Sequence, residues 1–449
     1  MTEPTTLLIK NARVVDFANK LEPVEIFIQG EAIAHVGPPG SHTLFPPTRI
    51  VDAKDRLVLP GFIDAHVHLR DSGVSNATQR AEEDFATGTK AAIAGGVTTV
   101  LDMPNTTPPT TTLEALQTKL AHCQKTAYCD FGLFAGATKD NADRVHTLIH
   151  EGAVAVKMYL GASTGSLLVD PPQKEEAFFK ASADYGFVLA LHAESQSCLN
   201  QHAALFNDTK KPRHSQVRPP ECAEHAVHQA LEFTQKYDNP TYFCHTSTKN
   251  EVQLIEAAKK EGLLVFLEAC THHLFLTADD ELYQENRVKM NPPLRSKHDV
   301  DALWRGLNDG TIDTVATDHA PHTRQEKNQN YWDAPAGVPG LETLMPLMLS
   351  AALEGKTTLE TVQKVCCENP AKIFGLEKKG QLKPGFDADL VFVDLDAEKP
   401  VDESKLQTRC GWSPYAGKPL RGWPTKVLLR SQTVFDNGRI QGPFGRRVK

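Results

Sequence analysis

The sequence predicts an α/β protein in which a (β/α)8 TIM-like barrel carries a small β-sandwich domain built from both chain termini. Two observations lead to this prediction. Short apolar runs alternate with helical segments through the middle of the chain. That alternation is typical of a parallel sheet, and eight parallel strands close a barrel. Strand-like runs separated by polar turns occupy both ends, and neither end alone could bury an apolar face.

The two ends supply the elements of the smaller domain. The N-terminal strands are predicted at residues 7–9, 24–28 and 32–36, and the C-terminal strands at 389–393 and 426–429. The dipeptide Asn437-Gly438 is a hairpin signal, because both residues tolerate positive φ. We therefore expect residues 1–56 and 378–449 to form the composite domain and residues 57–377 to form the barrel.

The barrel elements follow in order along the chain. Strands are predicted at residues 62–69, 97–103, 128–135, 153–160, 187–193, 241–244, 263–267 and 312–317. Helices are predicted at residues 83–94, 113–124, 142–150, 174–185, 221–236 and 251–261. Residues 271–295 form a longer connection than a usual βα loop, which favours a functional segment.

Composition excludes several classes of protein. The chain has 449 residues, a formal net charge of −8 and 40% apolar residues, so it can bury a large core but lacks the basic surface that nucleic acid requires. Its longest apolar runs are too short for a membrane span, and residues 1–10 do not resemble a signal peptide. The nine scattered cysteines are expected to be buried thiols in a reducing compartment. We expect a cytoplasmic protein with no nucleic-acid or membrane partner.

Candidate metal ligands lie at or near the ends of the predicted strands. His66 and His68 are two residues apart, so in a strand both side chains point to one face, about 7 Å apart. This pair alone is a weak signal, but His192, His245 and Asp318 each end a further strand. Barrel enzymes build their sites from the carboxyl ends of strands, and His and Asp are suitable zinc ligands.

Lys157 is the sharpest of these candidates. It lies inside an apolar strand, where burial favours the neutral amine. A neutral amine can add carbon dioxide to form a carbamate, whose two oxygens can bridge two metals about 3.5–4 Å apart. The alternative is a lysine whose stem is buried while its ammonium reaches the barrel rim.

Several motifs resemble those of the cyclic amidohydrolases. They are PGFIDAHVHLR at residues 60–70, VKMYL at 156–160, LHAE at 191–194, CHTST at 244–248 and ATDHAPH at 316–322. Within that group the chain is most similar to dihydroorotases of the long, two-domain type, through MPNT at 103–106 and KMNPPLR at 289–295. The segment at 380–390 is shared more widely among two-domain amidohydrolases. The sequence RDSG at 70–73 departs from the REPG of many long dihydroorotases, and Lys157 stands where many have aspartate.

The resemblance implies a role for each ligand. His66 and His68 would bind one Zn²⁺ and His192 and His245 a second, with N6-carboxylated Lys157 bridging the two. Asp318 would bind a metal and shuttle the proton. The reaction would be the reversible hydrolysis of dihydroorotate to N-carbamoyl-L-aspartate, and the family favours a homodimer.

Specificity for dihydroorotate requires residues that bind the carboxylate on its ring. The resemblance assigns this role to Arg70, Asn105 and His322, which are all predicted at the active mouth of the barrel. Asn291 would contact the ring, although a Pro-Pro loop is also a rigid turn. Ser163 and Thr164 form a possible lid.

Two other functions stay open. Another cyclic amidohydrolase, such as a dihydropyrimidinase, hydantoinase or allantoinase, would not need the carboxylate clamp. A non-catalytic scaffold relative would not need the ligands.

Other polar residues are discounted as ligands or catalysts. His272 and His273 would diverge in a strand, and His225 and His228 are expected to be surface or packing residues on one helix face. Glu268 is expected to make a polar contact rather than to act as a catalyst. Glu194 would share the face of His192 only if the strand continued through it.

Overall fold

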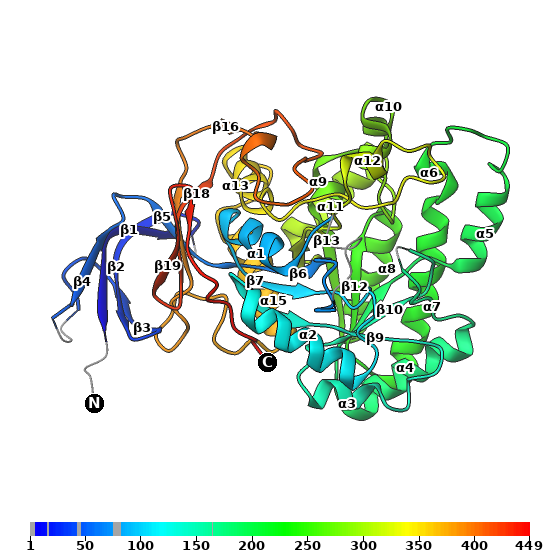
Figure 1. Cartoon of the computed structure of the whole chain (residues 1–449), viewed down its shortest axis with the longest axis horizontal. Helices are drawn as coiled ribbons and strands as arrows, with labels where there is room; N and C mark the ends of the chain where they lie inside the picture. Colours follow the sequence, from blue (N-terminus) through cyan, green and yellow to red (C-terminus); the bar gives the residue numbers. More distant parts are fainter. Residues whose placement is uncertain (1–4, 16–17, 43–45, 75–81, 164) are drawn as a thin grey trace.

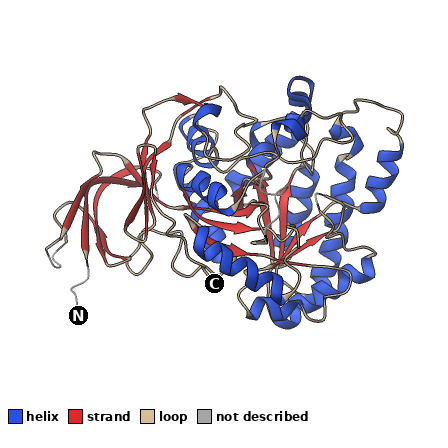
Figure 2. Ribbon diagram, viewed as in Figure 1, coloured by secondary structure: helices blue, strands red, loops and turns tan. Residues whose placement is uncertain are grey.

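The computed structural model describes the chain except residues 1–4, 16–17, 43–45, 75–81 and 164. Helices surround a central set of strands, and a separate sheet lies beside them (Figure 2). The strands from the two ends of the chain, blue and red in Figure 1, lie next to each other in that sheet. The predicted TIM-type α/β architecture with a strand-rich terminal part is confirmed.

Eight barrel strands occur where the sequence predicts them, the third being split into two short strands. They are β6 (Phe62–Val67), β7 (Val97–Asp102), β8 (Asp130–Leu133) with β9 (Ala135–Gly136), β10 (Val156–Tyr159), β11 (Leu189–His192), β12 (Thr241–Thr246), β13 (Val265–Cys270) and β14 (Thr314–Ala316). All pairs are parallel, in one three-stranded and one six-stranded sheet. Backbone hydrogen bonds join the two sheets at both edges, from Val154 N to Leu133 O at 2.9 Å and from His68 N to His319 O at 2.8 Å. The barrel is therefore closed.

Helices connect these strands on the outside. The six predicted helices are α1 (Phe85–Ala94), α2 (Leu113–Thr126), α3 (Val145–His150), α4 (Pro172–Tyr185), α7 (Pro220–Tyr237) and α8 (Lys249–Lys260). Further helices are α5 (Gln196–Ala204), α6 (His214–Val217), α9 (Thr271–Phe275), α10 (Glu281–Gln284), α11 (Lys297–Asp309), α12 (Arg324–Lys327), α13 (Leu344–Leu353), α14 (Leu359–Gln363) and α15 (Asn369–Ile373). The long segment at 271–295 contains α9 and α10 and short 3-10 turns. Helix α8 begins directly after its strand because Thr248 and Glu251 form a capping box.

The terminal sheet contains nine strands drawn from both ends of the chain. They are β1 (Thr6–Val15), β2 (Leu21–Gln29), β3 (Ala32–Gly37), β4 (Arg49–Asp52), β5 (Leu57–Pro60), β15 (Leu390–Asp394), β18 (Trp423–Leu429), β19 (Gln432–Asp436) and β20 (Arg439–Ile440). Strand β15 pairs with β5, which joins the C-terminal strands to the N-terminal ones. The hairpin predicted at Asn437-Gly438 connects β19 and β20.

Strand β15 belongs to two cores at once. Val391 and Val393 pack in the barrel core, whereas Leu390 and Phe392 pack in the core of the terminal sheet. Successive side chains of a strand point to opposite faces, so one strand can serve both. The division at residues 56/57 and 377/378 stays a prediction, and β5, which begins at Leu57, pairs within the terminal sheet.

A buried ionic cluster also ties the sheet to the barrel. The ammonium of Lys379 lies 2.5 Å from Asp130 of β8 and 2.6 Å from Asp389, and Arg430 donates to Asp130 as well. Burial alone would lower the pKa of Lys379, but the carboxylates around it raise that pKa. Lys379 therefore stays charged, and its pairing keeps the buried charges compensated.

The cysteines differ from the expectation. Cys198 and Cys222 form a disulfide, so the prediction that all nine are thiols is wrong for these two. The other seven are free and buried. The sequence could not reveal the pair, because 24 residues separate the two cysteines and only the packing of α5 against α7 brings them together. In the part of the chain that the structure describes, no helix is long and apolar enough to cross a membrane.

Candidate metal centre

The six predicted ligands come together at the carboxyl ends of the barrel strands. His66, His192 and His245 lie in the last two residues of β6, β11 and β12. Lys157 lies inside the short strand β10, and His68 and Asp318 follow β6 and β14. All six line one cavity with an empty volume of about 330 Å³. His245 and Asp318 have φ angles of 36° and 45°. These strained conformations turn the side chains from the strands into the cavity, and strain of this kind clusters at functional sites.

His66, His68 and Asp318 form the first half of the site. Oδ1 of Asp318 lies 3.3 Å from Nε2 of His66 and 2.9 Å from Nε2 of His68. Burial alone would raise the pKa of Asp318, but the two imidazoles lower it well below its usual range. Asp318 is therefore a carboxylate, which is the form that binds a cation.

Lys157, His192 and His245 form the second half. Nδ1 of His192 lies 2.9 Å from Nε2 of His245, and the ring of His245 lies 5.4 Å from that of His66. The Lys157 ammonium is fully buried, 2.9 Å from the sulfur of Cys244. The donor atoms of His66, His245 and Asp318 all lie within 4.8 Å of one another. The two halves therefore adjoin, with Lys157 in the same cavity.

The donor set fits bound metal ions. Nε2 of His66 is buried and makes no hydrogen bond to the described residues, although Oδ1 of Asp318 lies 3.3 Å from it. A buried polar atom of this kind is costly unless something binds it. Imidazole and carboxylate donors in one buried cluster are the ligands that zinc prefers.

Glu268 orients two of the ligands. Its Oε1 lies 2.8 Å from Nδ1 of His66 and accepts a hydrogen bond from the backbone N–H of His245 at 2.8 Å. Tyr242 donates to its other oxygen. With Nδ1 held by a carboxylate, Nε2 of His66 is directed into the cavity, as in many metal sites. The prediction of a polar contact at Glu268 is confirmed.

Glu194 makes the corresponding contact on the other side. It is fully buried, its Oε2 lies 2.9 Å from Nε2 of His192, and Arg218 pairs with it. Burial raises the pKa of Glu194, but the Arg218 guanidinium and the His192 imidazole together outweigh that effect and lower it. Arg218 lies before α7, and no local pattern singles it out, because only the fold brings it to Glu194.

Three of the four residues proposed to bind the substrate line the cavity. Arg70, Asn105 and Asn291 line the cavity, and Arg70 Nη2 lies 3.2 Å from Nε2 of His322. His322 is not among the residues that line the cavity. Oδ1 of Asn105 lies 2.6 Å from Nδ1 of His68, so Asn105 also orients a ligand.

Only one of the two predicted lid residues lies in the described part of the chain. Ser163 lines the cavity, whereas Thr164 lies outside the described residues.

Tyr159 was missed by sequence reasoning. It lines the cavity, and its buried hydroxyl has no hydrogen-bond partner among the residues that the structure describes. Its spacing could have revealed it, because it stands two residues after Lys157 on the same strand face.

The two predictions about the discounted histidine pairs differ in their result. His225 and His228 are exposed on α7, as predicted. The argument for His272 and His273 was wrong, because they lie in the short helix α9 and their rings are 4.2 Å apart. Both are buried, and neither lines the cavity.

Known proteins are similar to this chain in sequence and in fold. The amidohydrolase family model matches residues 57–434. A dihydroorotase from Methanosarcina acetivorans is 39% identical over 98% of this chain and 94% of its own, and one from Halobacterium salinarum is 39% identical over 95% and 96%. An L-hydantoinase from Paenarthrobacter aurescens is 31% identical over 97% and 95%. Among solved structures, the L-hydantoinase (dihydropyrimidinase) from Arthrobacter aurescens has a TM-score of 0.93 at 29% identity, covering 98% of this chain and 99% of that one.

Proposed function

Because this chain belongs to the amidohydrolase family, we propose that it is a metal-dependent dihydroorotase. The reaction is the reversible hydrolysis of the cyclic amide of dihydroorotate to N-carbamoyl-L-aspartate, and its reverse closes the ring in pyrimidine biosynthesis. The observation that carries the proposal is one cavity lined by six metal-ligand side chains together with Arg70. The identity of 39% to dihydroorotases over almost the whole chain supports it.

Two Zn²⁺ ions per chain are proposed for the cavity. His66, His68 and Asp318 would hold one ion, His192 and His245 would hold the other, and N6-carboxylated Lys157 would be a ligand shared by the two. The buried side chain of Lys157 lines the same cavity as the other five ligand residues, which supports this modification. When bound, the ions supply Lewis acidity that polarises the ring carbonyl and makes water a better nucleophile at neutral pH.

Asp318 moves the proton in this scheme. Water adds to the amide carbonyl carbon, and the carboxylate of Asp318 accepts the proton that water loses. The bond from that carbon to the ring nitrogen then breaks, and Asp318 returns the proton to the nitrogen. The same group therefore acts first as base and then as acid. Glu268 keeps His66 in place throughout.

Arg70 selects the substrate. Its guanidinium is buried beside the ligands, and its Nε makes no hydrogen bond to the described residues, although the carboxylate of Glu82 lies 3.6 Å from it. A planar guanidinium matches a carboxylate through two parallel hydrogen bonds. Asn105 completes the clamp and Asn291 contacts the ring, while His322 acts through Arg70, whose Nη2 lies 3.2 Å from its Nε2. The proposal also includes a lid over the cavity that contains Ser163. The protein is further proposed to be a cytoplasmic homodimer.

A second candidate function is hydantoinase or dihydropyrimidinase activity. The TM-score of 0.93 to an L-hydantoinase (dihydropyrimidinase) favours it. Such substrates carry no ring carboxylate and leave the guanidinium of Arg70 without a use.

The test compares hydrolysis of dihydroorotate and dihydrouracil by the zinc-loaded protein at one pH. The two rings differ only in the carboxylate. We expect a strong preference for dihydroorotate. A preference for dihydrouracil would transfer the assignment to the second candidate, and activity on neither would favour allantoin or a scaffold role.

A further inference from the structure

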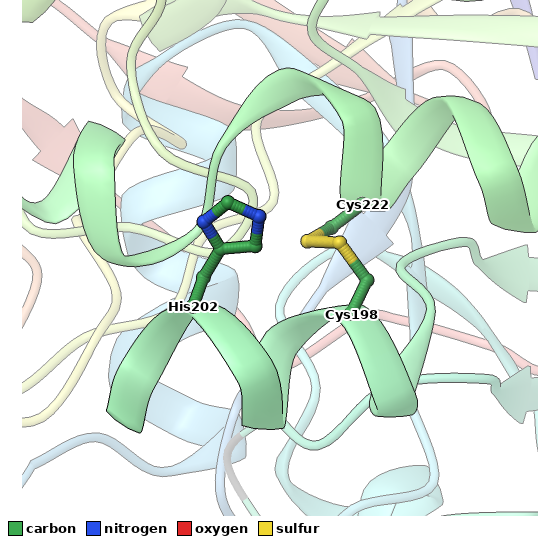
Figure 3. A group of neighbouring side chains, drawn as sticks. All are labelled: Cys198, His202 and Cys222. Carbon is green, nitrogen blue, oxygen red and sulfur yellow. A yellow bond between two sulfur atoms is a disulfide. The ribbon is translucent and has the colours of Figure 1, made fainter. Parts of the chain in front are cut away.

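A second cluster of metal-ligand side chains lies between α5 and α7. Cys198 and Cys222 are 7% and 0% exposed, their Cα atoms are 5.3 Å apart, and they form the disulfide described above. The imidazole of His202 faces this sulfur pair (Figure 3). The ligand atoms of the three residues all lie within 4.8 Å of one another. None of the three lines the cavity of the proposed active site.

Helical spacing explains why these groups converge. Cys198 and His202 are four residues apart on α5, so their side chains lie on one face of the helix. Glu221 and Cys222 lie in the first turn of α7, where the helix dipole stabilises negative charge such as a thiolate. One face of α5 therefore meets the first turn of α7.

Glu221 adds a fourth donor. Its Oε1 lies 3.4 Å from Nε2 of His202. Two donors that are each about 2.0–2.1 Å from a tetrahedral zinc ion are roughly 3.3 Å apart. The side chains of His202 and Glu221 are 28% and 48% exposed, which gives an ion a path from solvent. The cysteine sulfurs lie on the buried side.

We propose that Cys198, His202, Cys222 and Glu221 bind a thiophilic divalent cation, such as Zn²⁺, when the disulfide is reduced. A dithiol reductant supplies two electrons and two protons, the S–S bond breaks, and two thiols form while the reductant becomes a disulfide. Metal binding then displaces both thiol protons. Two sulfurs, an imidazole and a carboxylate are a set of four donors suited to zinc.

The position of this site gives it a structural consequence. The backbone N–H of Ser195 donates to the carbonyl of Cys222 at 2.7 Å, and Ser195 directly follows Glu194. Either the disulfide or the ion would therefore hold α5 against the start of α7, close to the Glu194–Arg218 pair. In the reduced protein the ion would add to the Ser195–Cys222 hydrogen bond in holding the two helices together.

Cobalt is the probe for the test, because thiolate-bound Co²⁺ has a near-ultraviolet charge-transfer absorption that nitrogen and oxygen ligands do not give. The purified full-length chain is titrated with Co²⁺ before and after reduction by a phosphine, which cleaves the disulfide and takes up oxygen from water. We expect the reduced protein to bind one more equivalent per chain than the oxidised protein and to gain this absorption. A reduced protein without both changes overturns the proposal.

Three variants assign the absorption. Cys198→Ser removes one thiolate, and we expect it to lose the additional equivalent. His202→Gln keeps both cysteines, and we expect at least a tenfold weaker Co²⁺ affinity at this site. His228→Gln changes an exposed histidine on α7 and should bind like wild type. The proposal fails if the absorption persists in Cys198→Ser, or if His202→Gln binds as tightly as the His228→Gln control.

Discussion

Arg70 offers the sharpest prediction about substrate choice. It is 6% exposed, its Nη2 lies 3.2 Å from His322, and its Nε lies 3.6 Å from Glu82. Two charge-assisted hydrogen bonds to the substrate carboxylate are worth about 1.5–3 kcal/mol each. At the low end, Arg70→Gln loses about 3 kcal/mol, which corresponds to roughly a hundredfold lower kcat/KM for dihydroorotate.

The assay measures kcat/KM for dihydroorotate and for dihydrouracil in each variant. Arg70→Gln should reduce only the dihydroorotate value, because dihydrouracil has no carboxylate to bind. Arg70→Lys keeps the charge but loses the planar pair of donors, so we expect a loss of about tenfold. Glu82→Gln is the matched control, because it removes the carboxylate that lies 3.6 Å from Arg70 and keeps the guanidinium. This variant should therefore keep the preference for dihydroorotate. Equal losses for both substrates in Arg70→Gln would refute the clamp and assign Arg70 a structural role.

Three further predictions concern metal, proton transfer and acid stability. Lys157→Ala should lower activity at least about a hundredfold and bind fewer than two metal ions per chain by elemental analysis; two ions with full activity would exclude the bridge. Ring opening needs ionised Asp318 and ring closure needs it protonated, so their initial rates should change with pH in opposite directions, and a common rise would contradict this role. Burial raises the pKa of Asp71, but hydrogen bonds from His122 and two backbone N–H groups outweigh it and lower the pKa to about 2. This stabilisation is present above about pH 4 and is lost as the pH falls through 2, so Asp71→Asn should cost about 2 kcal/mol in urea unfolding at pH 7 and less toward pH 3; a cost independent of pH would exclude this ionisation.

Local patterns were sufficient for most of the barrel. Hydrophobic runs located β6 to β14 because a strand buried on both faces must be apolar along its length. The strand-end rule placed His192, His245 and Asp318 in one cavity, since parallel strands carry all their carboxyl ends to the same face. Alternation along β10 could also have identified Tyr159 beside Lys157.

Contacts between distant segments could not be predicted in the same way. Arg218 pairs with Glu194 across 24 residues, and Glu268 reaches His66 across 202. His272 and His273 were misjudged because helix α9 begins directly after β13, where a continued strand was assumed.

By itself, the sequence determined the TIM-type fold, the order of its elements and the residue types of the candidate metal centre. These follow from periodicity and spacing, which are local properties of the chain. Only the tertiary structure decided which carboxylate orients which histidine, that His322 stands behind Arg70, and that Cys198 meets Cys222. Those contacts depend on how helices and loops pack around the barrel, and the distances between such segments are not encoded in any local pattern.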